Sequence, residues 1–180
     1  MTKKVIQIVF FVWIATILAS CASNDVQIYS EDTPVADIRE YFNGPIKAWG
    51  FIQDWRGRVT RRFDIDMVGS WDGDTGTLEE SFRFYDGELQ ERIWTLNRLS
   101  DSSFTGHAHD VIGQAQGQMS GNAVTMEYQL DVPYKDGTIK LTLDDRMWLM
   151  NDGVVINKTK MKKFGLTVGT LTIFMQKQAK

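Results

Sequence analysis

Two charged residues, Arg61 and Asp145, occupy positions where the alternation of residues predicts an apolar strand face. Arg61 alternates in step with Val59 and Phe63, and Asp145 in step with Leu143. A buried charge is costly unless it is paired. Because arginine binds carboxylates in a bidentate manner, Arg61 is a candidate for receiving the carboxylate of a ligand, with Asp145 beside it. Two structural alternatives are an Arg61–Asp145 ion pair and bulges that turn both residues outward.

The two histidines of the chain, His107 and His109, are weak candidates for metal ligands. Residues two apart on a strand face the same side, so both rings could reach one ion. A zinc site needs three or four ligands, and a carboxylate such as Asp110 would have to be the third. The alternative is a pair of exposed histidines, and we expect no metal and no cofactor.

Motifs of the common enzyme classes are absent from the sequence. It has no G-x-S-x-G elbow, no H-E-x-x-H helix, no P-loop and no dinucleotide fingerprint. Ser-His-Asp catalysis stays open on composition alone, but no pattern predicts it. We therefore predict no catalytic residues, and an enzyme acting on a lipid is the third of three hypotheses.

The only cysteine, Cys21, ends a segment that predicts lipid attachment. Lys3 and Lys4 precede an apolar run over residues 5–18, and small residues follow it, as in a secretory signal. The sequence Leu-Ala-Ser-Cys is similar to the bacterial lipoprotein processing signal, in which the cysteine receives a diacylglycerol. The apolar run is shorter than the roughly 20 residues of a spanning helix. An ordinary cleaved signal with an incidental cysteine is the other alternative.

Lipidation of Cys21 would place the protein in the cell envelope. Ala22 and Ser23 follow the cysteine without an aspartate, which favours the periplasmic face of the outer membrane. The whole chain has a formal charge of −3, and removal of residues 1–20 would make it more acidic. Nucleic acid requires a basic surface, so we expect no nucleic-acid partner.

The rest of the chain divides into a tether and one domain. Residues 21–32 are polar and lack periodicity, which predicts a lipidated tether. Thr33-Pro34 predicts the start of a short helix that ends at Asn43-Gly44, and we expect residues 33–180 to form a single β-barrel domain.

Everything after Pro45 is predicted to be β-structure. Asp-Gly pairs at 72, 86, 136 and 152, with Gly121-Asn122, give turn signals at regular spacing. Between the turns apolar and polar residues alternate, which is typical of antiparallel sheet with one buried face. We expect about ten strands in an up-and-down, lipocalin-like barrel, because closure hides the edges. A two-sheet sandwich is the alternative fold.

Small residues on the segment 113–121 complicate the predicted barrel wall. Gly113, Ala115, Gly117 and Gly121 share one face, and such a face either leaves room in the lumen or lets another group approach closely.

Several short segments are similar to one known family. They are GRVTRRF at 57–63, GSWDG at 69–73, GNA at 121–123, Asp144-Asp145 and KFG at 163–165. Together they resemble an uncharacterised proteobacterial envelope lipoprotein family, a domain of unknown function. The resemblance implies a calycin-like barrel and a link to fatty-acyl chemistry, and the two histidines are outside its pattern.

Two functions follow from these observations. The first is an outer-membrane lipoprotein that binds or carries a small apolar or fatty-acyl ligand in its barrel. The alternative is a structural or assembly lipoprotein that contacts another envelope protein, whose identity the sequence leaves open. An apolar cavity of several hundred Å³ would favour the first, and an interior filled by aromatic residues such as Trp49, Phe82, Phe84 and Trp94 the second.

Overall fold

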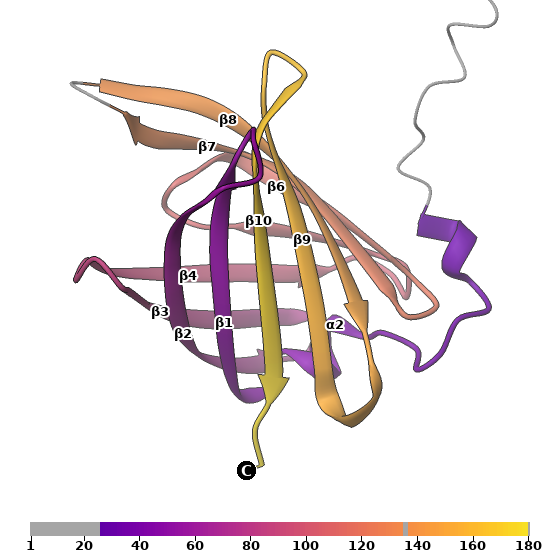
Figure 1. The fold of residues 1–180 in the computed structure, drawn as a ribbon. Coiled ribbons are helices and arrows are strands. Elements are labelled where there is room, and N and C mark those ends of the chain that lie inside the picture. The colour runs from indigo at the N-terminus through magenta and orange to yellow at the C-terminus, as the bar shows by residue number, and fades with distance from the viewer. Residues whose placement is uncertain (1–25, 135–136, 180) are drawn as a thin grey trace, which may run out of the picture.

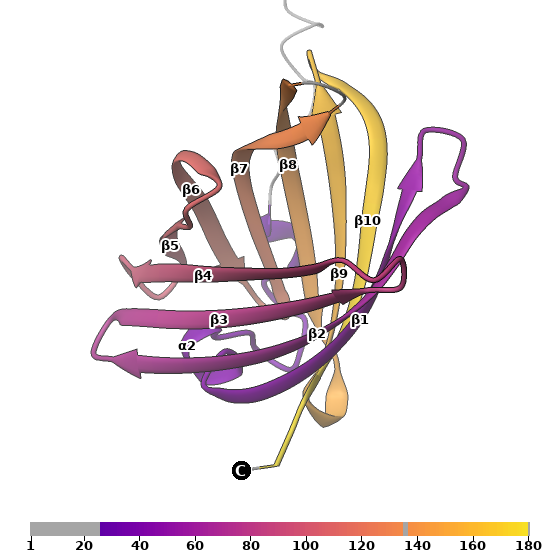
Figure 2. The same ribbon diagram turned by 90° about the vertical axis from the view of Figure 1, so that its left-hand side faces the viewer.

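The computed structural model describes residues 26–134 and 137–179, which form ten antiparallel strands closed into a barrel (Figure 1, Figure 2). Each strand pairs with the next along the chain, and the last pairs with the first. The predicted up-and-down barrel is therefore confirmed, and the sandwich alternative is wrong. The strands are β1 (Gly44–Asp54), β2 (Val59–Asp72), β3 (Thr75–Phe84), β4 (Leu89–Arg98), β5 (Ser103–His107), β6 (Val111–Ser120), β7 (Ala123–Tyr134), β8 (Gly137–Leu149), β9 (Val154–Lys163) and β10 (Leu166–Lys177).

The predicted turn signals connect the strands as expected. Asp72-Gly73 ends β2 and begins the turn to β3, Asp86-Gly87 lies between β3 and β4, and Asp152-Gly153 lies in the short 3-10 turn η2 (Asn151–Gly153) between β8 and β9. The glycines of these three pairs have positive φ, which glycine adopts without steric cost. Asp136 is outside the described residues.

Alternation along the strands places most of the large apolar side chains inside the barrel, but the predicted alternation fails at the start of β2. Along β7, Met126, Tyr128 and Leu130 are buried while the residues between them are exposed. Val59 was predicted to face inward but is exposed, because the register between β1 and β2 shifts after Ile52. The extra residue in β2 reverses the side on which Val59 lies.

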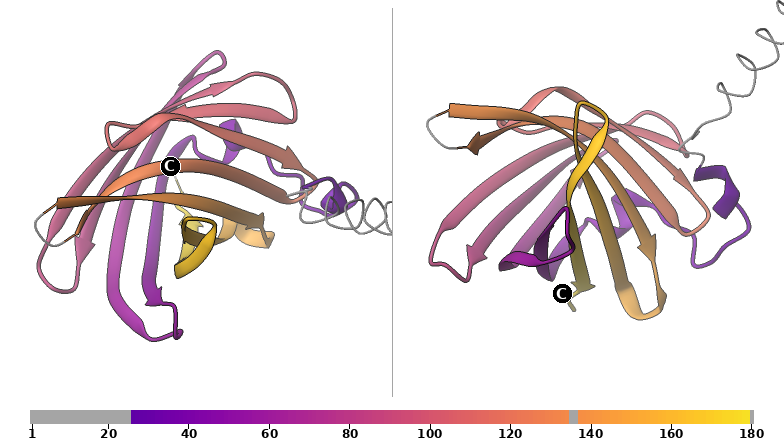
Figure 3. Two further views of the ribbon diagram at one scale, coloured as in Figure 1. Left: turned by 90° about the horizontal axis from the view of Figure 1, so that it is seen from above. Right: turned by 45° about the horizontal axis from the view of Figure 1, so that its top comes forward.

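A short helix, α2 (Ile38–Tyr41), closes one end of the barrel (Figure 3). It begins later than predicted: Asp37, not Thr33, is the N-cap, and its carboxylate accepts hydrogen bonds from the backbone N–H groups of Arg39 and Glu40. The chain after the helix lies against Gly69, where a Cβ atom would be 1.7 Å from the carbonyl oxygen of Phe42. Only glycine allows this approach, so β2 is adapted to the helix.

The segment before α2 is partly ordered against the barrel. The 3-10 helix η1 (Val26–Tyr29) packs on β6 and β7, and Val26 is buried. This half of the predicted tether is therefore attached to the domain, while residues 21–25 lie outside the described residues. In the described part of the chain, no helix has the length and apolar character needed to cross a membrane.

Two of the glycines in the segment 113–121 lie against neighbouring groups, whereas Gly113 is exposed at an irregularity of β6 and has open space around it. A Cβ atom on Gly117 would lie 2.1 Å from the Phe104 ring, and one on Gly121 would lie 1.6 Å from the carbonyl oxygen of Tyr29. The Phe104 side chain thus fills the space that Gly117 leaves, and η1 fills the space at Gly121. Neither glycine enlarges the lumen.

Candidate functional site

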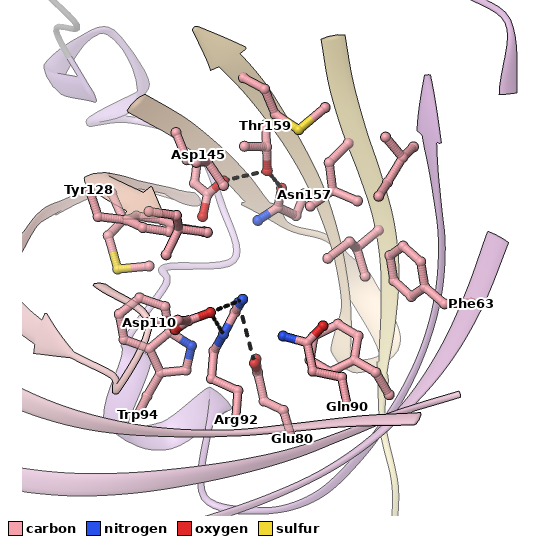
Figure 4. Close-up of a pocket in the computed structure, with 18 of the residues that line it drawn as sticks. Phe63, Glu80, Gln90, Arg92, Trp94, Asp110, Tyr128, Asp145, Asn157 and Thr159 are labelled. Carbon is pink, nitrogen blue, oxygen red and sulfur yellow. Dashed lines mark hydrogen bonds and ion pairs between the residues drawn. The ribbon is translucent and has the colours of Figure 1, made fainter. Parts of the chain in front are cut away.

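The barrel encloses a cavity of about 630 Å³ (Figure 4). Every strand except β6 contributes to its wall. Phe82, Phe84 and Trp94 line the cavity without filling it, and Trp49 lies outside, against Phe174 on the outer face. Apolar side chains form most of the wall, including Phe63, Met67, Leu78, Leu141, Leu143 and Ile173.

The two ends of the cavity differ. Phe42, at the end of α2, lies in the wall at the closed end, where the β2–β3 and β8–β9 turns gather. At the other end the wall includes exposed residues: Glu88 after the β3–β4 turn, His109 before β6, and Pro133 near the end of β7. The cavity therefore opens at the end of the barrel away from α2.

A charged cluster stands on the wall formed by β3 and β4. Glu80 and Arg92 are direct partners in the register of these strands, and Asp110 reaches them from the β5–β6 connection (Figure 4). Arg92 donates from Nε and Nη2 to Oδ2 of Asp110 at 3.1 and 2.7 Å, and its Nη1 lies 3.9 Å from Oε2 of Glu80. The Arg92 side chain is only 14% exposed. The cluster is thus a largely buried ion network inside an apolar cavity.

A second polar group lies across the cavity on β7, β8 and β9. Asp145 and Thr159 are partners in the β8–β9 register, and the Thr159 hydroxyl is hydrogen-bonded to Oδ1 of Asp145. The same hydroxyl lies 3.0 Å from Oδ1 of Asn157, and the Tyr128 hydroxyl also bonds Asp145. Among the described residues, Asp145 forms no ion pair within 4 Å, although it is only 4% exposed. Hydroxyl groups stabilise its charge at hydrogen-bond distance, and Arg92 acts on it from across the cavity without forming an ion pair.

The environment of these carboxyl groups favours their protonated forms. Burial raises the pKa of Glu80 to about 7, although Arg92 and a hydrogen bond from Trp94 oppose the shift. Burial also raises the pKa of Asp145 to about 6 against the hydrogen bonds from Thr159 and Tyr128. The pKa of Tyr128 lies well above its ordinary value, for burial first and the nearby Asp145 second. Both carboxyl groups therefore change charge close to neutral pH.

Arg61 and Asp145, which the sequence singled out together, line the same cavity but do not pair. Arg61 lies near the open end, where it binds Asp86 at 2.8 Å and Glu88 at 2.9 Å and stacks over the Phe84 ring. The predicted Arg61–Asp145 ion pair is wrong, because the two residues are held by other partners. An outward-facing Asp145 is also wrong, since alternation along β8 directs it inward with Leu143.

The two histidines are exposed. Nδ1 of His107 lies 3.0 Å from the carbonyl oxygen of Gly113, while His109 is at the mouth of the cavity. Within residues 26–134 and 137–179, no three His, Cys, Asp or Glu residues are grouped so that they could hold a metal ion.

Sequence reasoning missed Glu80 and Arg92, and it considered Asp110 only as a metal ligand. The signal was available for the first two: Glu80 alternates in step with Leu78 and Phe82, and Arg92 in step with Trp94. The alternation argument that identified Arg61 as a charge on an apolar strand face applies equally to Glu80 and Arg92. Asp110 carries no such signal, since it lies on a connection and only the closed barrel brings it to Arg92.

Comparison with solved structures supports the fold. The S-type phycobiliprotein lyase CPES from Guillardia theta superposes with a TM-score of 0.57 over 79% of this chain and 92% of that one, at 7% sequence identity. At this identity the likeness concerns the barrel architecture. No curated protein matches the chain.

Comparison with family models covers nearly all of the sequence. A model described as protein of unknown function (DUF3833) matches residues 15–177, which include every strand and both polar groups of the cavity. The resemblance noted in the sequence is thereby confirmed for a domain of unknown function, whereas the proteobacterial envelope origin stays a prediction. The chain belongs to the DUF3833 family.

Proposed function

We propose that this protein is a membrane-anchored binding protein that holds a small apolar ligand in its barrel. The observation that carries the proposal is the cavity of about 630 Å³, open at one end and walled mostly by apolar side chains. Its volume is in the range typical of small-molecule sites. The alternative, a structural lipoprotein with a filled barrel, predicted that Trp49, Phe82, Phe84 and Trp94 would occupy this space. Trp49 lies on the outer face, and the other three line the cavity without filling it.

A neutral fluorescent probe tests the cavity as a binding site. We expect N-phenyl-1-naphthylamine to bind the full-length chain with enhanced fluorescence. Leu143 is buried and lines the cavity, so Leu143→Trp should fill part of the space and weaken probe binding by about tenfold, the equivalent of about 1.4 kcal/mol. Fluorescence titration measures both affinities.

The matched control is Thr142→Trp, on the neighbouring residue of β8 that faces the outside of the barrel. It adds the same ring without entering the lumen, so probe affinity should be unchanged. Equal affinities of both variants and the parent chain would show that the probe binds elsewhere, and the cavity would lose its proposed role.

Anchoring through Cys21 is the second part of the proposal. Cys21 precedes the described residues, and its role is supported by the signal-like residues before it. Val26 is the fifth residue after Cys21, so a lipid on Cys21 would hold η1 within about 17 Å of the bilayer. Because η1 packs beside the β6–β7 turn at the closed end, the mouth of the cavity would then face away from the membrane.

We expect Cys21→Ser to abolish acylation. When the protein is expressed in a bacterial host, radiolabelled palmitate should enter the parent chain, and the variant should remain unlabelled and unprocessed. Equal labelling of both chains would remove Cys21 as the acylation site. Labelling of neither, with the protein still membrane-bound, would point to an uncleaved apolar anchor.

A further inference from the structure

We propose that the ligand of this cavity carries a protonated amine or another cationic head group, attached to an apolar body. This inference deepens the proposed function and depends on it. It departs from the expectation of a fatty-acid carboxylate bound by arginine. The arginines of the wall are paired, the buried carboxylate of Asp145 forms no ion pair, and apolar side chains continue the wall from Asp145.

The cations of the cavity wall are already paired. Arg61 holds two carboxylates at the mouth, Asp86 and Glu88, at 2.8 and 2.9 Å. Arg92 donates two N–H groups to Asp110, and its third nitrogen lies 3.9 Å from Glu80. An anionic ligand at either arginine would be repelled by the carboxylates already held there, which offsets the pair it gains.

The anions of the wall exceed the cations. Among the described residues, two arginines and five carboxylates line the cavity. Asp145 is more buried than Glu80 and Asp110 and forms no ion pair: Thr159 and Tyr128 supply hydrogen bonds, and Arg92 acts on it only from across the cavity. Around Arg92, Oε2 of Glu80 and Oδ1 of Asp110 are shielded from solvent and accept no hydrogen bond. Acceptors are thus in surplus on both sides of the cavity, and hydrogen-bond donors on a ligand would balance them.

The position of Asp145 suits the head group of an elongated ligand. In Figure 4 its carboxylate lies across the cavity from Arg92, with Tyr128 and Asn157 beside it. From there the apolar side chains of Leu143, Leu141 and Ile173 continue the wall. A cation at Asp145 would gain a charge-assisted hydrogen bond to a buried carboxylate, where such bonds are strong.

Matched ten-carbon compounds test the head group. Decylamine, decanol and decanoate share one chain and differ in charge at pH 7.5. Each is titrated against N-phenyl-1-naphthylamine bound to the full-length chain. We expect decylamine to displace the probe at a concentration about 10- to 100-fold lower than decanoate, with decanol between them.

Two variants assign the preference to Asp145. Asp145→Asn keeps the shape and removes the charge, so decylamine affinity should fall about tenfold while decanol affinity stays within about twofold. Glu127→Gln removes a carboxylate from the outer face of β7 and should change neither. Thermal unfolding of both variants checks that they are folded.

Each other outcome overturns the inference. Strongest displacement by decanoate would show an anion site, and equal displacement by all three would show that the head group is not recognised. Probe binding without displacement by any of them would exclude this ligand class while leaving the binding function intact. Failure of the probe itself to bind would overturn the proposed function, and the inference with it.

Discussion

Replacement of Arg92 by Met is expected to lower the free energy of unfolding by about 3–5 kcal/mol at pH 8. Methionine keeps most of the apolar volume of the side chain and removes the guanidinium that balances Glu80 and Asp110. These carboxylates are 11% and 19% exposed, so water replaces the lost partner poorly. Urea unfolding at equilibrium, followed by tryptophan fluorescence, measures the change.

A surface ion pair next to the cluster provides the control. Arg83 lies on β3 and binds Asp66 on β2 at 2.5 Å, with both side chains about half exposed. Arg83→Met should lose at most about 1 kcal/mol, because exposed pairs contribute little. Adding Asp110→Asn to Arg92→Met should recover part of the stability. If Arg92→Met were no worse than Arg83→Met, the cavity would have to be wet enough to solvate its carboxylates.

The barrel could be predicted because its determinants are local. Positive-φ glycines after aspartate mark the hairpins, and alternation over short windows tells the buried face from the exposed one. With short turns and no crossover helices, sequential pairing leaves two edges, and closure is the simplest way to remove them. The predicted inward orientation of Val59 was wrong because a bulge depends on how two strands pair, and the sequence of one strand does not reveal that pairing.

The site could be predicted only in part, for a related reason. Alternation identified Arg61 and Asp145 as inward-facing charges, and both line the cavity. The ion-pair partners of the cavity arginines could not be found from sequence spacing. Asp86 is 25 residues from Arg61, and Asp110 is 18 residues from Arg92. Which carboxylate meets which arginine depends on the register and curvature of the closed sheet. Charge balance inside the cavity, on which the ligand proposal depends, therefore emerges only from the structure.

Substitution of Glu80 by Gln should make the protein more stable in a pH-dependent manner. The folded-state pKa of about 7 is above the ordinary value of 4.5, because burial disfavours the charged form. Between these two values the unfolded chain binds fewer protons than the folded chain, so the contribution of Glu80 to stability falls as pH rises. A shift of this size corresponds to a penalty of about 3 kcal/mol above pH 7. Glutamine has no such ionisation and removes the penalty.

We therefore expect Glu80→Gln to match the parent chain at pH 4 and to exceed its free energy of unfolding by about 1–3 kcal/mol at pH 8, since the buried amide still loses some hydration. Glu79→Gln, on the exposed face of the same strand, should show no such trend. Urea unfolding from pH 4 to pH 8 gives the curve for each variant. Arg92 keeps its ion pair with Asp110 in Glu80→Gln, so the cluster stays balanced. A loss of stability at pH 8 would mean that ionised Glu80 is needed by Arg92, and that the ion network outweighs the cost of burying it.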